Sequence, residues 1–183
     1  MNSMTFTAPW GSSLITTSIV AVVVVLLVSA AVCFGPKLNR MLYREREVKG
    51  EAICRLLAVC IPVVSLLAGA LFIVRGYTVT GDAIRVHRLG WSSTVPLDGL
   101  ESATVSPDAV RRASRTRGNG GFFSYTGRFR SRTLGSFRAF VTDHARTVVL
   151  RFRDRSEGDQ VVVMSPDDPD AFVALLSGEP PRD

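Results

Sequence analysis

The chain has 183 residues, with 22 basic and 16 acidic side chains, a formal net charge of +6 and 46% hydrophobic residues. This length is enough for one ordinary domain and a smaller second part. The mean hydropathy of +0.23 is high for a soluble protein, and it excludes a chain that is evenly polar along its length.

The first apolar run covers residues 14–34, LITTSIVAVVVVLLVSAAVCF, and contains no charged side chain. A helix rises about 1.5 Å per residue and the hydrocarbon core of a bilayer is about 30 Å thick, so the run predicts a transmembrane helix. A cleaved signal peptide is the alternative. It is disfavoured because the apolar region is long and because the tail before it, residues 1–13, has no Lys or Arg.

A second apolar run covers residues 56–74, LLAVCIPVVSLLAGALFIV, again without charge, and predicts a second transmembrane helix. A buried hairpin inside a soluble core is the alternative for both runs.

The connector, residues 35–55, carries six basic residues: Lys37, Arg40, Arg44, Arg46, Lys49 and Arg55. Basic residues favour the cytoplasmic side. We therefore expect a multi-pass protein of the cell membrane, with the connector in the cytoplasm and the C-terminal domain outside.

The three cysteines are Cys33, Cys54 and Cys60, all in or beside the apolar runs. The chain beyond residue 75 has none, so neither a disulfide framework nor a thiol metal site is expected there. Small residues such as Gly69 and Ala70 leave a homo-oligomer packed through the helices open.

The chain beyond residue 75 predicts short strands. Residues 77–80 and 83–88 alternate around a Gly-Asp turn, which is typical of a hairpin. Further strands are predicted at residues 93–97, 100–105, 137–142, 147–152 and 160–164, and a short helix is allowed near residues 108–114. Antiparallel strands this short have to close or stack, so we expect a barrel of about seven strands.

One amphipathic helix is predicted at residues 165–177. Ser165 is the expected N-cap and Pro166 the first helical residue, and Asp168 is placed to complete a capping box. The apolar stripe consists of Ala171, Phe172, Leu175 and Leu176. Gly178 ends the helix before a tail, residues 178–183, and the helix is suited to cap an open end of the barrel.

Three stretches carry a resemblance to a known family: YTVTGDAIRVHRLGWSSTVPLDGL (77–100), GNGGFFSYTGRFRSRTLGSFRAFVTD (118–143) and VVVMSPDDPDAFVALL (161–176). Preceded by two apolar runs, they resemble bacterial pleckstrin-homology (PH) domain proteins over nearly all of residues 76–177. The resemblance implies a bent, seven-stranded barrel capped by a C-terminal helix, with no catalytic residue and no established ligand. No phosphate-binding motif of eukaryotic PH domains matches here residue by residue.

Residues 111–138 combine arginine, glycine and aromatic residues, with eight Arg and no Asp or Glu. Phe137 and Phe140 belong to a predicted strand and are expected in the core. Gly118, Gly120 and Gly121 are expected to form a tight turn with positive φ. The remainder reads as a long basic loop.

This segment is the candidate binding surface. Arginine pairs with phosphate or carboxylate in a fork, and aromatic rings favour the membrane interface. We therefore expect contact with anionic lipid headgroups or with a membrane-associated partner protein, and a solvated basic loop is the alternative. The candidate residues are Arg111, Arg112, Arg115, Arg117, Phe122, Phe123, Tyr125, Arg128, Arg130 and Arg132.

Other chemistry is not indicated. His87 and His144, without a neighbouring Cys, do not make a metal site, and helix capping explains the aspartates near residue 168. No nucleophile elbow or nucleotide-binding glycine motif is present, and a membrane anchor argues against nucleic acid. We expect a non-enzymatic, membrane-anchored binding or scaffold module without a cofactor. A regulatory accessory subunit of a membrane enzyme or transporter is the alternative.

Overall fold

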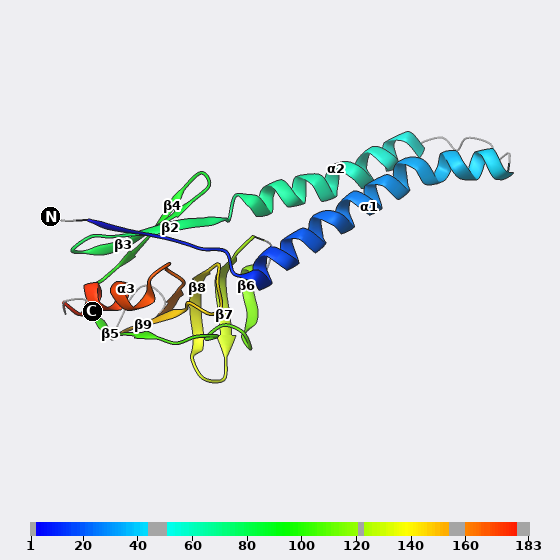
Figure 1. Cartoon of the computed structure of the whole chain (residues 1–183). Coiled ribbons are helices and arrows are strands. Elements are labelled where there is room, and N and C mark those ends of the chain that lie inside the picture. Colours follow the sequence, from blue (N-terminus) through cyan, green and yellow to red (C-terminus); the bar gives the residue numbers. More distant parts are fainter. Residues whose placement is uncertain (1–2, 44–50, 121–122, 154–159, 179–183) are drawn as a thin grey trace.

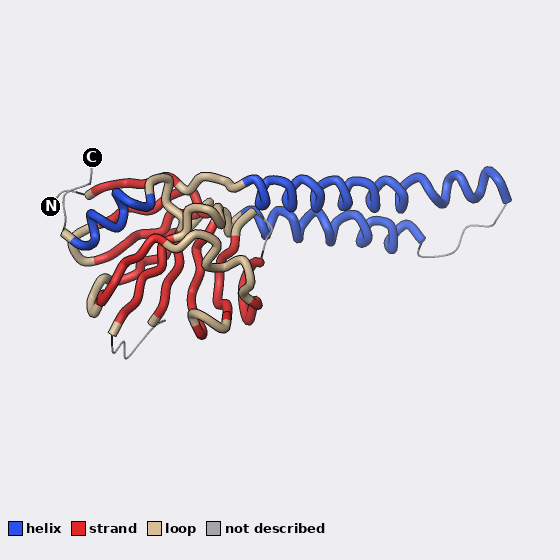
Figure 2. Tube along the Cα trace, turned by 60° about the horizontal axis from the view of Figure 1, so that its bottom comes forward, coloured by secondary structure: helices blue, strands red, loops and turns tan. Residues whose placement is uncertain are grey.

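The computed structural model describes residues 3–43, 51–120, 123–153 and 160–178. Its helices are α1 (Ser12–Tyr43), α2 (Glu51–Ala70) and α3 (Pro169–Ser177). The ten strands in these ranges are β1 (Met4–Thr7), β2 (Val74–Val79), β3 (Ala83–Arg88), β4 (Ser92–Pro96), β5 (Leu100–Val105), β6 (Ser114–Gly120), β7 (Tyr125–Ser131), β8 (Gly135–Val141), β9 (Val148–Phe152) and β10 (Val161–Met164). The two long helices lie side by side and project from a β-rich domain (Figures 1 and 2).

The strands form two sheets, with the orders β1-β2-β3-β4 and β5-β9-β10-β8-β7-β6. The expected barrel of about seven strands is corrected: the ten described strands lie in two sheets that do not close, and one pair, β8 with β10, is parallel. The sheets separate after β4. There Gly99, with φ of 70°, turns the chain, and its carbonyl oxygen accepts a hydrogen bond from the Arg153 N–H (2.8 Å). β5 therefore pairs with β9 rather than with β4.

The main hydrophobic core lies between the two sheets and α3. Phe172 of α3 is fully buried, and its ring meets that of Phe6 edge to face at 5.0 Å between centroids. Phe137 and Phe140 are both fully buried, as predicted. They belong to different clusters because β8 alternates its side chains: Phe140 joins the main core, and Phe137 packs with Phe129 in a second cluster on the other face of the sheet.

Residues ahead of α1, expected to be a tail, form strand β1. β1 pairs antiparallel with β2, so Phe6 lies opposite Tyr77. Asp167 fastens the end of the strand, because its N–H donates to the Thr7 carbonyl oxygen (3.0 Å) and its carboxylate accepts from the Thr7 hydroxyl (2.7 Å). The chain before α1 and the chain after α2 therefore belong to one sheet.

Both long helices expose apolar side chains. Within the described residues, α1 is the one helix long and apolar enough to cross a membrane, over Ser12–Gly35, and only 6% of its most apolar window is buried. The second predicted span is not confirmed, because its apolar helical part, Leu56–Ala70, is shorter. The helix ends before Val74, which begins β2 and is fully buried in the main core.

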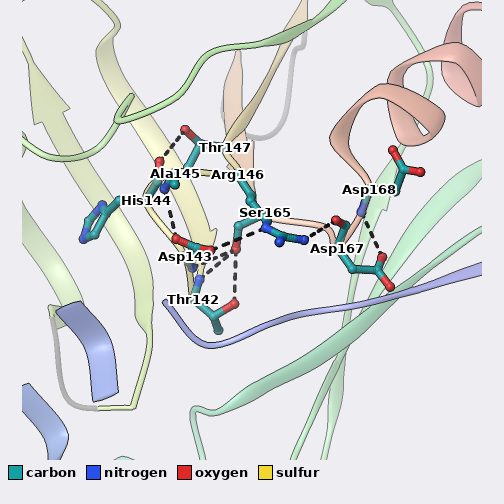
Figure 3. A network of polar contacts seen from close by, with 9 residues as sticks. All are labelled: Thr142, Asp143, His144, Ala145, Arg146, Thr147, Ser165, Asp167 and Asp168. Carbon is teal, nitrogen blue, oxygen red and sulfur yellow. Dashed lines mark hydrogen bonds and ion pairs between the residues drawn. The ribbon is translucent and has the colours of Figure 1, made fainter. Parts of the chain in front are cut away.

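The C-terminal helix begins later than predicted. Its N-cap is Asp168, whose carboxylate accepts a hydrogen bond from the Ala171 N–H (3.0 Å), and Pro169 is the first helical residue. Ser165 is not the cap because its hydroxyl is used elsewhere: it accepts from the backbone N–H of Thr142 at 2.8 Å (Figure 3). Gly178 ends the helix in the left-handed conformation, as expected.

The short helix allowed near residues 108–114 is absent, because residues 107–112 form turns and β6 begins at Ser114. The carbonyl oxygen of His144 accepts a hydrogen bond from the Asp108 N–H (2.7 Å), which ties these turns to the loop before β9. Val110 is buried beneath the turns against the second core cluster. The turns therefore cover the outer face of the six-stranded sheet.

Candidate binding surface

The segment predicted as a long basic loop contributes to three strands. β6, β7 and β8 form antiparallel pairs, with Arg117 opposite Arg128 and Arg128 opposite Arg138. β7 has the alternation that a strand requires, because Phe129 is buried while Arg128 and Arg130 are exposed. The length of the polar run obscured this pattern in the sequence.

The glycines of this segment serve strand pairing rather than one tight turn. Gly118 in β6 and Gly127 in β7 lie opposite each other, with φ of 110° and 138°. A side chain on either would collide with the backbone of the facing strand, so both have to be glycine. The expected turn at Gly118 and Gly120 is therefore corrected, and Gly121 lies outside the described residues.

Four of the predicted arginines line one groove, of about 1260 Å³, which we call the basic groove. Arg111 and Arg112 reach it from the β5–β6 turns, Arg130 from the end of β7 and Arg132 from the β7–β8 turn. All four are exposed. Among the described residues that line it, Asp108 is the one carboxylate, and it lies 3.4 Å from the guanidinium of Arg111.

The other three predicted arginines lie outside this groove. Arg115 extends along β6 and donates a hydrogen bond to the carbonyl oxygen of Gly118 (3.2 Å). Arg117 and Arg128 are exposed on the paired strands β6 and β7. Figure 1 shows β6 beside the start of α1, whereas the turn between β7 and β8 points away from the helices. These three arginines are therefore spread along the β6–β7 hairpin and do not join the four in the groove.

The two described aromatic residues of the predicted site, Phe123 and Tyr125, make their contacts outside the basic groove. The Phe123 ring centroid lies 6.2 Å from that of Trp10. The backbone N–H of Phe123 donates a hydrogen bond to the hydroxyl of Ser18 in α1 (3.2 Å). Tyr125 packs edge to face on His144, at 4.4 Å between centroids. Phe122 lies outside the described residues. The predicted site is thus divided, because four of its arginines line the groove, whereas Phe123 contacts α1 and Tyr125 packs on His144.

A smaller cavity of about 480 Å³ lies behind the groove, where the first turn of α1 meets the β5–β6 turns. His144 lines this cavity, and its Nδ1 is buried without a hydrogen-bond partner among the described residues. Burial lowers the pKa of His144. The carboxylates of Asp108 and Asp143 oppose that shift, and Arg111 adds to it. The ring is therefore held in its neutral form.

Comparison with known protein families matches residues 75–179 to the family described as "Bacterial PH domain". The chain belongs to the bacterial PH domain family. Neither the curated proteins nor the solved structures contain a match to it. The matched region includes all strands from β2 onward except the first residue of β2, together with α3. Membership of this family indicates a binding or scaffold module.

The PH domain also holds a pair of arginines that sequence reasoning missed, Arg88 at the end of β3 and Arg138 in β8. Both guanidinium groups lie over the ring of Phe140, with Cζ 5.1 and 4.8 Å from its centroid. Arg88 also lies over Trp91, at 5.5 Å. Burial and the charge of Arg138 lower the pKa of Arg88. The pair is distant in sequence and joins the two sheets, so no local motif marks it.

Within the described ranges, no three His, Cys, Asp or Glu side chains of the PH domain gather as a metal site requires. The chemistry on this surface is that of guanidinium donors on a folded β-hairpin. Such donors recognise carboxylate or phosphate oxygens, singly or in pairs.

Proposed function

We propose that this chain is a non-enzymatic, membrane-anchored binding module whose PH domain holds an acidic segment of a partner protein in the basic groove. The observation that carries the proposal is the convergence of Arg111, Arg112, Arg130 and Arg132 on that groove, beside a single described carboxylate. Exposed guanidinium groups keep their charge and form paired hydrogen bonds with carboxylates at little desolvation cost. Side chains in solution can approach it freely, because the groove opens at the surface.

The position of the groove favours a protein over the bilayer as its ligand. Its rim includes the β7–β8 turn, which points away from the two long helices (Figure 1). The aromatic residues that would favour a lipid interface, Phe123 and Tyr125, pack against α1 and His144 instead. A basic surface without exposed aromatic residues, held away from the membrane, suits an acidic peptide.

The proposed anchor is a hairpin of α1 and α2 that crosses the membrane twice. A core helix of a soluble protein would be covered, whereas the apolar window of α1 is 6% buried. Because β1 before α1 pairs with β2 after α2, a chain that crosses along α1 has to return along α2. α2 has 20 residues, about 30 Å of helix, of which Leu56–Ala70 is the apolar part.

Two further observations support the anchor. Cleavage of α1 as a signal peptide would remove β1 and with it Phe6, which is 4% exposed in the main core. The two tryptophans of the chain both lie at the base of the helices: Trp10 meets Phe123, and Trp91 meets Phe72, two residues beyond α2. Tryptophan is enriched at membrane interfaces.

The basic connector predicts that the domain lies outside the cytoplasm. A test is a chain with Asp183→Cys that lacks Cys33, Cys54 and Cys60, treated in intact cells with a membrane-impermeant thiol reagent. Labelling is expected. Protection in intact cells, followed by labelling after lysis, would place the domain in the cytoplasm and direct the search for partners there.

The groove is tested by the affinity of the full-length chain, in zwitterionic nanodiscs, for a fluorescent glutamate-rich peptide. We expect the double variant Arg130→Gln/Arg132→Gln to bind at least about tenfold more weakly, since each lost charged hydrogen bond contributes at least about 1.5 kcal/mol. The matched control is Arg85→Gln/Arg151→Gln, which removes two exposed arginines from other strands. An equal loss of peptide affinity in the two double variants would show that only the net charge of the chain matters, and it would overturn the proposal.

A further inference from the structure

The pair formed by Arg88 and Arg138, which we call the junction pair, is built differently from the basic groove. Arg88 comes from the four-stranded sheet and Arg138 from the six-stranded sheet, and both guanidinium groups rest on the fully buried ring of Phe140. The pair therefore lies at the seam where the two sheets meet.

No described carboxylate is paired with either arginine of the junction pair. Neither guanidinium forms an ion pair or a side-chain hydrogen bond within the described part of the chain, and Nε of Arg88 is buried without a partner. The repulsion of two half-buried positive charges is only partly offset by the π face of Phe140. A buried N–H without an acceptor costs free energy that a ligand oxygen would recover. An anion bound at the seam would therefore relieve the charge repulsion and accept a hydrogen bond from the unpaired N–H.

The surroundings of the junction pair identify which anion. Trp91, beneath the guanidinium of Arg88, meets Phe72 edge to face at 5.3 Å, just beyond the end of α2. Trp91 and Leu89 are large apolar residues that stay 39% and 45% exposed at this point. A soluble anion gains nothing from exposed apolar neighbours, whereas a lipid brings acyl chains that cover them.

We propose that the junction pair is a binding site for the phosphate of an anionic membrane lipid, which enters from the bilayer beside the base of α2. Arg88 and Arg138 donate to its non-bridging oxygens, and Trp91 and Leu89 contact the glycerol and upper acyl region. The site rests on the proposed membrane hairpin, because only that hairpin brings the seam to headgroup depth, but it does not depend on the basic groove.

The test uses the full-length chain with Trp10→Phe, purified in a neutral detergent, so that Trp91 is the only tryptophan. Phosphatidylglycerol is titrated while Trp91 fluorescence is recorded, with phosphatidylcholine as the comparison lipid. We expect saturable binding of phosphatidylglycerol. Arg88→Gln and Arg138→Gln, tested separately, are each expected to raise the half-saturating concentration roughly tenfold or more.

Matched controls separate this site from the groove and from net charge. Arg85→Gln changes an exposed arginine of the same strand, and Arg130→Gln/Arg132→Gln changes the groove; both are expected to bind phosphatidylglycerol as the parent does. Parent-like phosphatidylglycerol binding in these two controls, together with weaker binding in the junction variants, supports the site. This result does not depend on whether the groove binds an acidic peptide. Unchanged binding in both junction variants would overturn it, and so would an equal loss in Arg85→Gln.

A second measurement decides between a lipid and a soluble anion. Inorganic phosphate is titrated against the same Trp91 signal and against the melting temperature. We expect no saturation at concentrations where phosphatidylglycerol saturates. Equal saturation by the two would assign the site to a soluble anion and overturn the lipid assignment. A cooperative melt of each variant without lipid establishes that the β-domain is folded.

Discussion

The basic groove and the junction pair use the same residue type in opposite environments. The groove arginines stand on turns and strand ends, exposed, with a carboxylate beside them. The junction arginines are half-buried, rest on an aromatic ring and have no carboxylate partner in the described residues. Replacing a solvated arginine removes a binding group and little else, whereas the junction pair is embedded in the packing of both sheets. Composition alone counted Arg138 with the groove arginines in the segment 111–138 and gave no sign of its pairing with Arg88.

The largest expected effect is at the ring that supports the junction pair. Phe140 is fully buried in the main core, so Phe140→Ala leaves a cavity and is expected to lower the free energy of unfolding by about 3–5 kcal/mol. Unfolding of the full chain in micelles, followed by circular dichroism in denaturant, measures it. A decrease in the free energy of unfolding of less than about 1 kcal/mol would contradict tight packing at the seam. The junction pair would then not differ from the groove in this respect.

A smaller effect is expected at the phenol behind that ring. The hydroxyl of Tyr77 donates to the carbonyl oxygen of Phe140 (2.6 Å) and accepts from the N–H of Ser165 (3.2 Å). Tyr77→Phe leaves both backbone groups buried without this partner, so we expect a loss of about 2 kcal/mol in the same unfolding measurement. Burial also raises the pKa of Tyr77 to about 12, so the parent should lose stability as pH rises above about 10, and the variant should not.

A pH effect is expected behind the groove. Burial lowers the pKa of His144 in the folded chain, with Asp108 and Asp143 opposing and Arg111 assisting. The unfolded chain therefore binds the proton more readily, and stability falls as pH drops below about 6.5 toward the folded pKa. The slope of unfolding free energy between about pH 7 and 5 should be shallower in His144→Gln. Identical slopes would mean that the ring is solvated, like the groove arginines beside it.

The smallest effect is expected at the groove itself. Arg132→Gln changes an exposed side chain on the β7–β8 turn, and Arg111→Gln breaks an exposed ion pair with Asp108. Neither should measurably change the free energy of unfolding, because exposed ion pairs contribute little to stability. A clear destabilisation by either variant would show that the groove arginines also contribute to packing. The contrast between the groove and the junction pair would then not hold.

Local patterns in the sequence predicted local structure well. The β2–β3 hairpin follows from alternation, β4, β5, β9 and β10 follow from short runs between turn residues, and the end of α3 follows from Gly178. Long-range pairing was not predictable in the same way. β1 is four residues long and pairs with a strand beyond two helices, and Ser165 was misread because its acceptor role depends on Thr142, which is distant in sequence.

The candidate site was predicted in part for the same reason. The arginines of residues 111–138 were found from composition, and four of them do line one groove. Tyr125 is separated from Arg130 by the alternation of side chains along β7, whereas Phe123 precedes that strand and Arg111, Arg112 and Arg132 stand on turns. The junction pair was missed because Arg88 and Arg138 meet only when the two sheets pack together.

The pairing of β1 with β2 sets an order of assembly. Phe6 precedes both long helices in the chain and Tyr77 follows them, so the four-stranded sheet cannot be completed until the helices have been synthesised. Without β1 in place, the ring of Phe172 lacks its edge-to-face contact with Phe6. A chain whose helices are misplaced would keep its first strand away from the domain. For the membrane hairpin proposed above, correct insertion is thus a condition for finishing the fold, and pairing of β1 with β2 requires that both helices are in place.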